Sequence, residues 1–224
     1  MNQAVYRAAD AINSAMLRVY NHMALAIATS GIVSLLVSSS PTLMKFLFTG
    51  VMHWLVIFAP LAFVLFLGFK IRDMSAGTAR LMLYLFAAVM GLSFSTIFVV
   101  YNLGSIVSAF MGAAILFVTM SGYGYFTKRS LESVGQFMFI GLIAIIIASI
   151  VNIFIGSSVM TMVISALAII IFLGLTAYDT QQIRQMVSVF EPDSNAEIVG
   201  ALTLYMDFIN LFLNLLQLFG GRKD

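Results

Sequence analysis

Long stretches without a charged residue constrain this chain more than any other feature. Residues 81–127 and 133–178 contain no Asp, Glu, Lys or Arg. A membrane-spanning helix needs roughly 20 mostly apolar residues, so each stretch is long enough for two spans. Of the 224 residues, 62% are hydrophobic and 9% are charged, and a soluble protein of this size could not bury so much apolar surface. The sequence therefore predicts an all-α membrane protein, with the lipid bilayer as its partner.

Charged residues and turn sequences divide the chain into seven predicted spans. Tyr101–Ser105 and Gly156–Ser158 are typical of turns, and each splits one of the two long stretches. Pro60 is expected to kink the second span. The predicted spans are 23–38, 46–69, 81–101, 105–126, 135–155, 159–179 and 198–219. The polar residues between the last two, Gln181–Glu197, are interpreted as a loop. Its acidic part, Glu191–Glu197, is interpreted as a solvated turn, with a handle for a partner as the alternative.

The first 21 residues lack a continuous apolar stretch, so they do not resemble a signal peptide. Val5, Ile12 and Val19 recur at helical spacing, with Arg7 and Arg18 on the opposite face. Residues 1–21 are therefore expected to form an amphipathic helix on the membrane surface. No soluble domain is left over, so residues 1–224 are predicted to form a single polytopic membrane domain.

The distribution of Lys and Arg over the predicted loops indicates the orientation. Eight lie on the side of the N-terminus, and three, Lys45, Arg222 and Lys223, lie on the other side. Cytoplasmic loops carry the excess of Lys and Arg, so the N-terminus is expected in the cytoplasm and the C-terminus outside. No basic run is dense enough to predict a nucleic-acid partner. The absence of cysteine excludes disulfides and thiolate metal sites.

Only two acidic residues fall within the predicted spans. Asp179 ends the sixth, and Asp207 lies about nine residues into the seventh, which is roughly 13 Å along a helix. Because the two spans run in opposite directions, both residues are expected in the cytoplasmic half of the bilayer. Asn210, Asn214 and Gln217 follow Asp207 at helical spacing and form a polar stripe. Lipid would penalise that stripe, so we expect it to face protein or water.

Two carboxyl groups in a medium of low dielectric constant would share one proton, so the pair is a candidate pH sensor. When deprotonated, Asp179 and Asp207 are candidate oxygen ligands for a hard cation such as Ca²⁺. The alternative is that each aspartate only forms a hydrogen bond with a neighbouring helix and has no sensing role. Lys70 and Arg72, at the end of the second span, could form a salt bridge with a carboxylate and latch a gate, or could simply set the orientation.

The segments Leu175–Gln182 and Gly200–Phe212, with the run Tyr-Met-Asp-Phe-Ile-Asn-Leu-Phe in the second, resemble the bacterial branch of the Bax-inhibitor family. The resemblance covers essentially the whole chain. It implies an integral protein of a bacterial inner membrane, whose last helix is central and is surrounded by six others in two three-helix layers. It also implies a pH-sensitive calcium leak, with Asp179 and Asp207 as the sensing pair and Lys70 or Arg72 as the latch.

Three functions compete on these observations. The first is a cation leak that handles Ca²⁺ and protons and requires no cofactor. The second, also implied by the resemblance, is a regulator that binds a membrane-embedded quality-control protease and transports nothing. The third is an intramembrane aspartyl protease, but Asp179 follows Thr-Ala-Tyr rather than the Gly-x-Gly of such enzymes. We therefore expect a protein that is not an enzyme.

Overall fold

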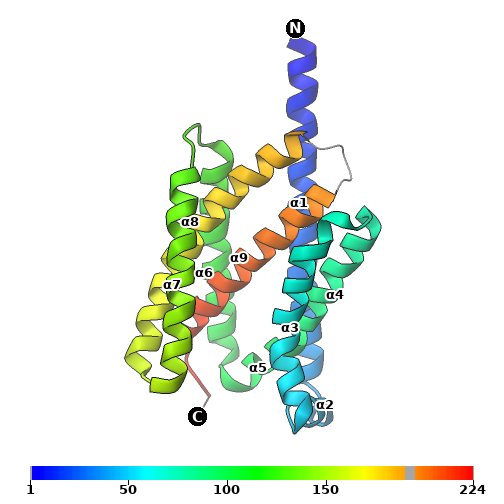
Figure 1. Ribbon diagram of the computed structural model, residues 1–224. Helices are drawn as coiled ribbons and strands as arrows, with labels where there is room; N and C mark the ends of the chain where they lie inside the picture. Colours follow the sequence, from blue (N-terminus) through cyan, green and yellow to red (C-terminus); the bar gives the residue numbers. More distant parts are fainter. Residues whose placement is uncertain (1, 190–194, 224) are drawn as a thin grey trace. The chain divides into compact units, whose positions relative to one another are not determined.

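The computed structural model describes residues 2–189 and 195–223, apart from the side chains of residues 2–9 and of Arg72. This part of the chain is helical and contains no β-strand (Figure 1). A short 3-10 helix, Ile71–Asp73, follows α3. The α-helices are α1 (Asn2–Ser38), α2 (Pro41–Leu47), α3 (Val51–Lys70), α4 (Ala76–Phe94), α5 (Ile97–Val100), α6 (Leu103–Phe126), α7 (Glu132–Ile155), α8 (Ser158–Val189) and α9 (Asn195–Phe219).

Seven helical segments of the described chain are long and apolar enough to cross a membrane, which confirms the predicted number of spans. The turns expected near Asn102 and Ser157 lie between helices, as predicted. The span in α9 is the most buried, with 67% of its most apolar stretch covered by protein, against 39% or less in the others. The seven spans are Asp10–Ser38, Val51–Lys70, Ala76–Val100, Leu103–Phe126, Glu132–Ile155, Ser158–Val189 and Asn195–Phe219.

Three boundaries differ from the predicted ones. Residues 1–21 were predicted as a separate helix, but α1 continues without a break from Asn2 to Ser38 because no Gly or Pro interrupts it near residue 22. The predicted second span began at 46, yet residues 41–47 form the separate helix α2. Gly50 then adopts a φ of +63°, which favours glycine, before α3 begins.

The third difference affects the candidate site. The loop predicted over Gln181–Glu197 is wrong for residues 181–189 and 195–197, which are helical; residues 190–194 lie outside the described part of the chain. Helix α8 continues ten residues beyond Asp179 because Ile183 and Val187, one turn apart, are both buried. Asp179 is therefore inside a helix rather than at its end.

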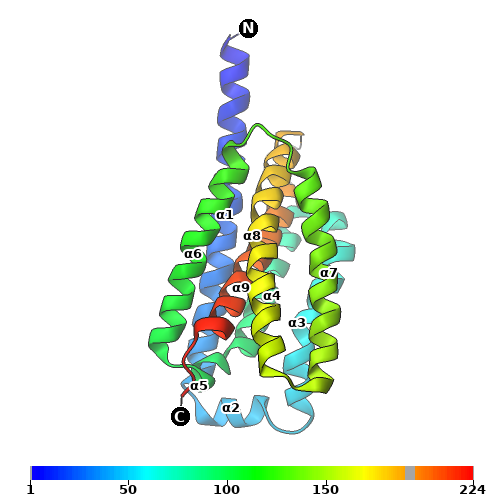
Figure 2. The same ribbon diagram turned by 90° about the vertical axis from the view of Figure 1, so that its left-hand side faces the viewer.

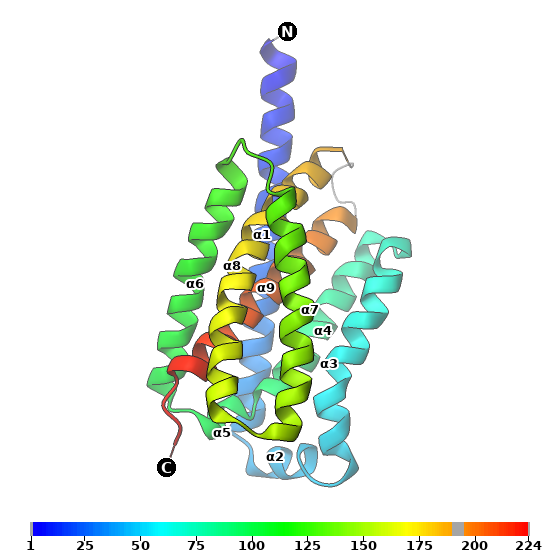
Figure 3. The same cartoon turned by 60° about the vertical axis from the view of Figure 1, so that its left-hand side comes forward.

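The chain divides into two compact units. Unit 1 contains α1 to α5 and the first part of α9, and in it α4 packs against both α1 and α3 (Figure 1). Unit 2 contains α6, α7, most of α8 and the rest of α9. In unit 2, α8 lies between α6 and α7 (Figures 2 and 3). The two three-helix layers around a central last helix stay a prediction.

Candidate functional site

Asp179 and Asp207 lie together in unit 2, with their carboxyl groups close enough to form a hydrogen bond. Asp207 is 4% exposed and Asp179 is half-buried. Among the described residues, no N–H or hydroxyl group donates to Oδ2 of Asp207. A carboxylate only accepts hydrogen bonds, so a bond between two carboxyl groups requires that one of them holds a proton.

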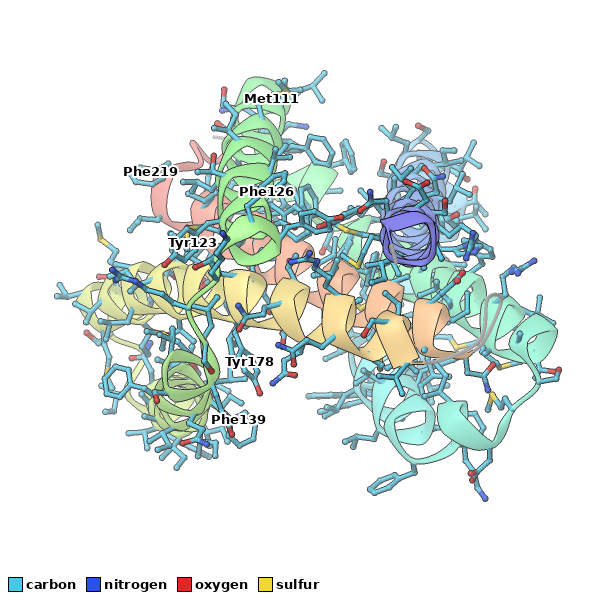
Figure 4. The ribbon with its side chains drawn as sticks, turned by 90° about the horizontal axis from the view of Figure 1, so that it is seen from above. Met111, Tyr123, Phe126, Phe139, Tyr178 and Phe219 are labelled. Atoms are coloured by element: carbon cyan, nitrogen blue, oxygen red, sulfur yellow. The ribbon has the colours of Figure 1, made fainter. Side chains whose placement is uncertain are left out.

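Close contacts with α6 and α7 fix the part of α8 that carries Asp179. A methyl group added at Gly124 in α6 would overlap the backbone of Ala177. One added at Gly135 in α7 would overlap the ring of Tyr178, which lies on the α7 side of α8 (Figure 4). Hydroxyl groups of Ser121 in α6 and of the buried Thr180 are 2.9 Å apart and hydrogen bonded. Asp179 thus projects from a closely packed helix segment.

Aromatic packing holds the part of α9 that carries Asp207. The ring of Phe208, the next residue, packs edge-on against Phe110 and Phe117 of α6, with centroid distances of 5.2 and 5.9 Å. Phe208 itself is buried. Since α6 contacts both α8 and α9 in this way, it fixes the separation of the two acidic side chains within unit 2.

The polar stripe after Asp207 bonds mainly to its own helix. The side-chain amides of Asn210 and Asn214 each donate to the carbonyl oxygen four residues earlier, at 2.8 Å. Gln217 accepts a hydrogen bond of 2.9 Å from the buried Ser165 of α8. Gln217 is exposed, whereas both asparagines are half-buried. The stripe therefore links α8 and α9 at its far end.

The described residues offer little for a tightly bound metal ion. They contain no group of three or more His, Asp or Glu side chains placed to hold one. Ca²⁺ takes six to eight oxygen ligands, so two carboxyl groups would need help from backbone oxygens, amides or water.

Sequence reasoning missed an ion pair that the structure describes. In unit 1 the guanidinium of Arg18 donates from Nε to Oε2 of Glu197 at 2.9 Å and from Nη2 to Oε1 at 2.7 Å. Glu197 is 3% exposed, so it is not part of a solvated loop. The neighbouring Asn195 donates to the backbone oxygens of Ile71 and Met74. The start of α9 is thus attached to α1 and to the segment after α3.

Comparison with known proteins identifies the family. A family model described as "Inhibitor of apoptosis-promoting Bax1" matches residues 12–224. The chain belongs to the Bax-inhibitor family. It is 39% identical over 214 residues to the inner membrane protein YbhL of Escherichia coli K12, covering 93% of this chain and 92% of YbhL. It is also 38% identical over 212 residues to the uncharacterized protein RP147 of Rickettsia prowazekii, covering 93% and 90% of the two chains.

In this Bax-inhibitor protein, the expected salt bridge from Lys70 or Arg72 to the acidic pair stays a prediction. Lys70 is the last residue of α3 and is exposed. The side chain of Arg72 lies outside the described part of the structure. Both residues belong to unit 1, whereas Asp179 and Asp207 belong to unit 2. Within unit 1, the segment that follows Lys70 is held by hydrogen bonds from Asn195 at the start of α9.

Proposed function

We propose that this integral membrane protein is a pH-sensitive leak pathway for Ca²⁺, with Asp179 and Asp207 as its proton sensor. The observation that carries the proposal is the close approach of two carboxyl groups inside two spans. Loss of the shared proton leaves two carboxylates that repel each other in a medium of low dielectric constant. The contact between α8 and α9 at this point therefore depends on protonation.

Loss of the shared proton also changes how many carboxylate oxygens the pair can use to bind a cation. With its proton, the pair carries one negative charge, and its hydrogen bond occupies one oxygen of each group. Without the proton, four carboxylate oxygens become acceptors, and hard cations prefer such ligands. Asn210 and Asn214 supply further oxygen atoms one and two turns along α9. A resident cofactor and a catalytic step form no part of this proposal.

The proposed location is the inner membrane of a bacterium, with the N-terminus in the cytoplasm. The relative YbhL is named an inner membrane protein, and the excess of Lys and Arg on the side of the N-terminus supports the orientation. In this orientation α8 ends at the cytoplasmic side, and Asp179 lies ten residues before that end. The sensor is then closer to the cytoplasm than to the outside.

The test is Ca²⁺ flux into proteoliposomes that hold a calcium indicator, measured across a range of pH. We expect flux through the wild-type protein to change with pH, and we expect Asp179→Asn and Asp207→Asn to remove that dependence, because an amide cannot share the proton. Asp73→Asn is the matched control, since Asp73 is an exposed acid in the turn after α3. An unchanged pH profile in both pair variants overturns the sensor assignment.

A wild-type protein that passes no Ca²⁺ at any pH would overturn the leak itself. That result would favour the regulatory function that the family resemblance also implies. It would then be followed by purification from native membranes and a search for a bound membrane protease.

A further inference from the structure

An open groove lies beside α2 in unit 1, far along the chain from the acidic pair. Its volume is about 700 Å³. Among the described residues that line it, Lys45 is the one charged side chain and none is acidic. Two hydroxyl groups, from Thr42 and Thr49, accompany Lys45, and the rest of the lining is apolar. The lining residues are Pro41, Thr42, Lys45, Phe46, Thr49, Val51 and Met52.

The position of α2 places the groove at the end of a membrane span. α2 runs crosswise to α1 and α3, which are both candidate spans and which it connects (Figure 2). None of the seven residues of α2, all of which the structure describes, is buried. Phe46 is 61% exposed beside the exposed Lys45. A short helix with one cationic and several apolar exposed side chains is typical of the boundary between headgroups and acyl chains.

Val51 and Met52, which line the groove, are the first residues of α3, and α3 continues from them as a mostly exposed apolar helix. Only 11% of the apolar stretch of α3 is buried. Trp54, which is 61% exposed, stacks on Phe58 with a centroid distance of 6.1 Å and an angle of 12° between the rings. Tryptophan is enriched at the membrane interface, where its ring lies at headgroup level. From Leu55 to Phe66 the exposed residues of α3 are aliphatic or aromatic, as an acyl chain requires.

The positive charge of Lys45 favours an anionic ligand in the groove. Lys45 is the only Asp, Glu, Lys or Arg residue between Arg18 and Lys70, so no carboxylate in that stretch can neutralise it. We propose that the groove binds an anionic phospholipid, whose phosphate contacts Lys45 and the Thr42 hydroxyl and whose acyl chain lies along Trp54 and Phe58. A free phosphate ion would match Lys45 equally well, but it would leave the apolar lining in contact with water. A lipid satisfies both parts of the groove.

The experiment uses the fluorescence of Trp54, which is the only tryptophan in the chain. The full-length protein is reconstituted in mixtures of phosphatidylglycerol and phosphatidylcholine, with bromine on the acyl chains of one lipid at a time. Bromine quenches tryptophan at short range, so the two quenching curves give the relative affinity of the two lipids beside Trp54. We expect brominated phosphatidylglycerol to quench more strongly at equal mole fraction, with a preference of about three- to fivefold.

Substitutions at Lys45 test the cause of the preference. Lys45→Gln is expected to abolish it, and Lys45→Arg, which keeps the charge, is expected to retain it. Lys70→Gln is the matched control, because Lys70 is an exposed lysine at the other end of α3. Helical circular dichroism of each variant establishes that it is folded before quenching is compared.

Three results would overturn the proposal. Equal quenching by the two brominated lipids in the wild-type protein would show that the groove does not select anionic lipid. A preference that survives Lys45→Gln would show that another group selects it. Relief of the quenching by millimolar inorganic phosphate would identify a site for the free ion instead of a lipid.

Discussion

Glu197 and Asp207 are both almost fully buried on α9, with 3% and 4% of their surfaces exposed, but they have different partners. Glu197 faces the guanidinium of Arg18, which binds both of its carboxylate oxygens. Asp207 faces another carboxyl group. A bidentate guanidinium stabilises the charged form of an acid, whereas a second carboxyl group requires a shared proton. The first contact is thus suited to holding α9 in place, and the second is the one to which we assign the proposed response to pH.

Glu197→Gln should therefore destabilise the protein without removing its response to pH. Breaking a buried ion pair on one side costs about 3–5 kcal/mol, and because 35% of the Arg18 side chain is exposed we expect about 1–3 kcal/mol here. The measurement is the midpoint of thermal unfolding in detergent. Glu132→Gln, at an exposed glutamate in the first turn of α7, is the control.

The double variant Arg18→Gln/Glu197→Gln separates the ion pair from a local packing defect. It should lose less stability than the sum of the two single variants, because neither charge is then left without its partner. Strictly additive losses, or a Glu197→Gln variant as stable as the control, would contradict the role assigned to this pair.

At the scale of the helices, a glycine in α6 allows α8 to pack closely against α6. Gly122 and Gly124 lie in the same helix α6, two residues apart, but only Gly124 faces the backbone of α8. Gly122 has no atom of a neighbouring segment within 4 Å of the position that a Cβ would occupy. Close approach of two helix backbones at small residues is a common way of packing spans in membranes.

Gly124→Ala is expected to destabilise the protein by about 1–3 kcal/mol, because the added methyl group forces α6 away from α8. Gly122→Ala should be neutral or stabilising by up to about 1 kcal/mol, since alanine favours a helix more than glycine does. Thermal unfolding of the two variants under the same conditions measures the difference. Equal midpoints would mean that α6 and α8 do not meet at Gly124.

Sequence reasoning predicted the helices better than their contacts. Uncharged stretches long enough for two spans gave the number of spans, because the bilayer thickness fixes span length. The sequence also identified Asp179 and Asp207 as unusual, since charge is costly in lipid. It placed Glu197 in a loop because polar residues surround it, although Ser194 and Glu197 have the spacing of a helix-capping box. Nothing in the sequence distinguishes Gly122 from Gly124, because the packing of α6 against α8 determines which of the two contacts α8.

At the scale of the whole molecule, the number of spans and the loop charges together predict the side on which each segment lies. Seven candidate spans, an odd number, predict that the two ends of the chain lie on opposite sides of the membrane. The segment between α6 and α7 contains Lys128 and Arg129 and is expected in the cytoplasm. The segment between α1 and α2, with one lysine nearby, is expected outside. The orientation matters because it decides which compartment the acidic pair senses.

The absence of cysteine makes this orientation directly testable, since any introduced cysteine is the only one to react. Lys128→Cys and Ser39→Cys each place one thiol at an exposed position in a segment between helices. In intact cells, a maleimide that cannot cross the inner membrane should label Ser39→Cys and not Lys128→Cys. In inverted membrane vesicles the pattern should be reversed. The opposite pattern would place the N-terminus outside, and the ten residues of α8 beyond Asp179, about 15 Å of helix, would then connect the pair to the external pH.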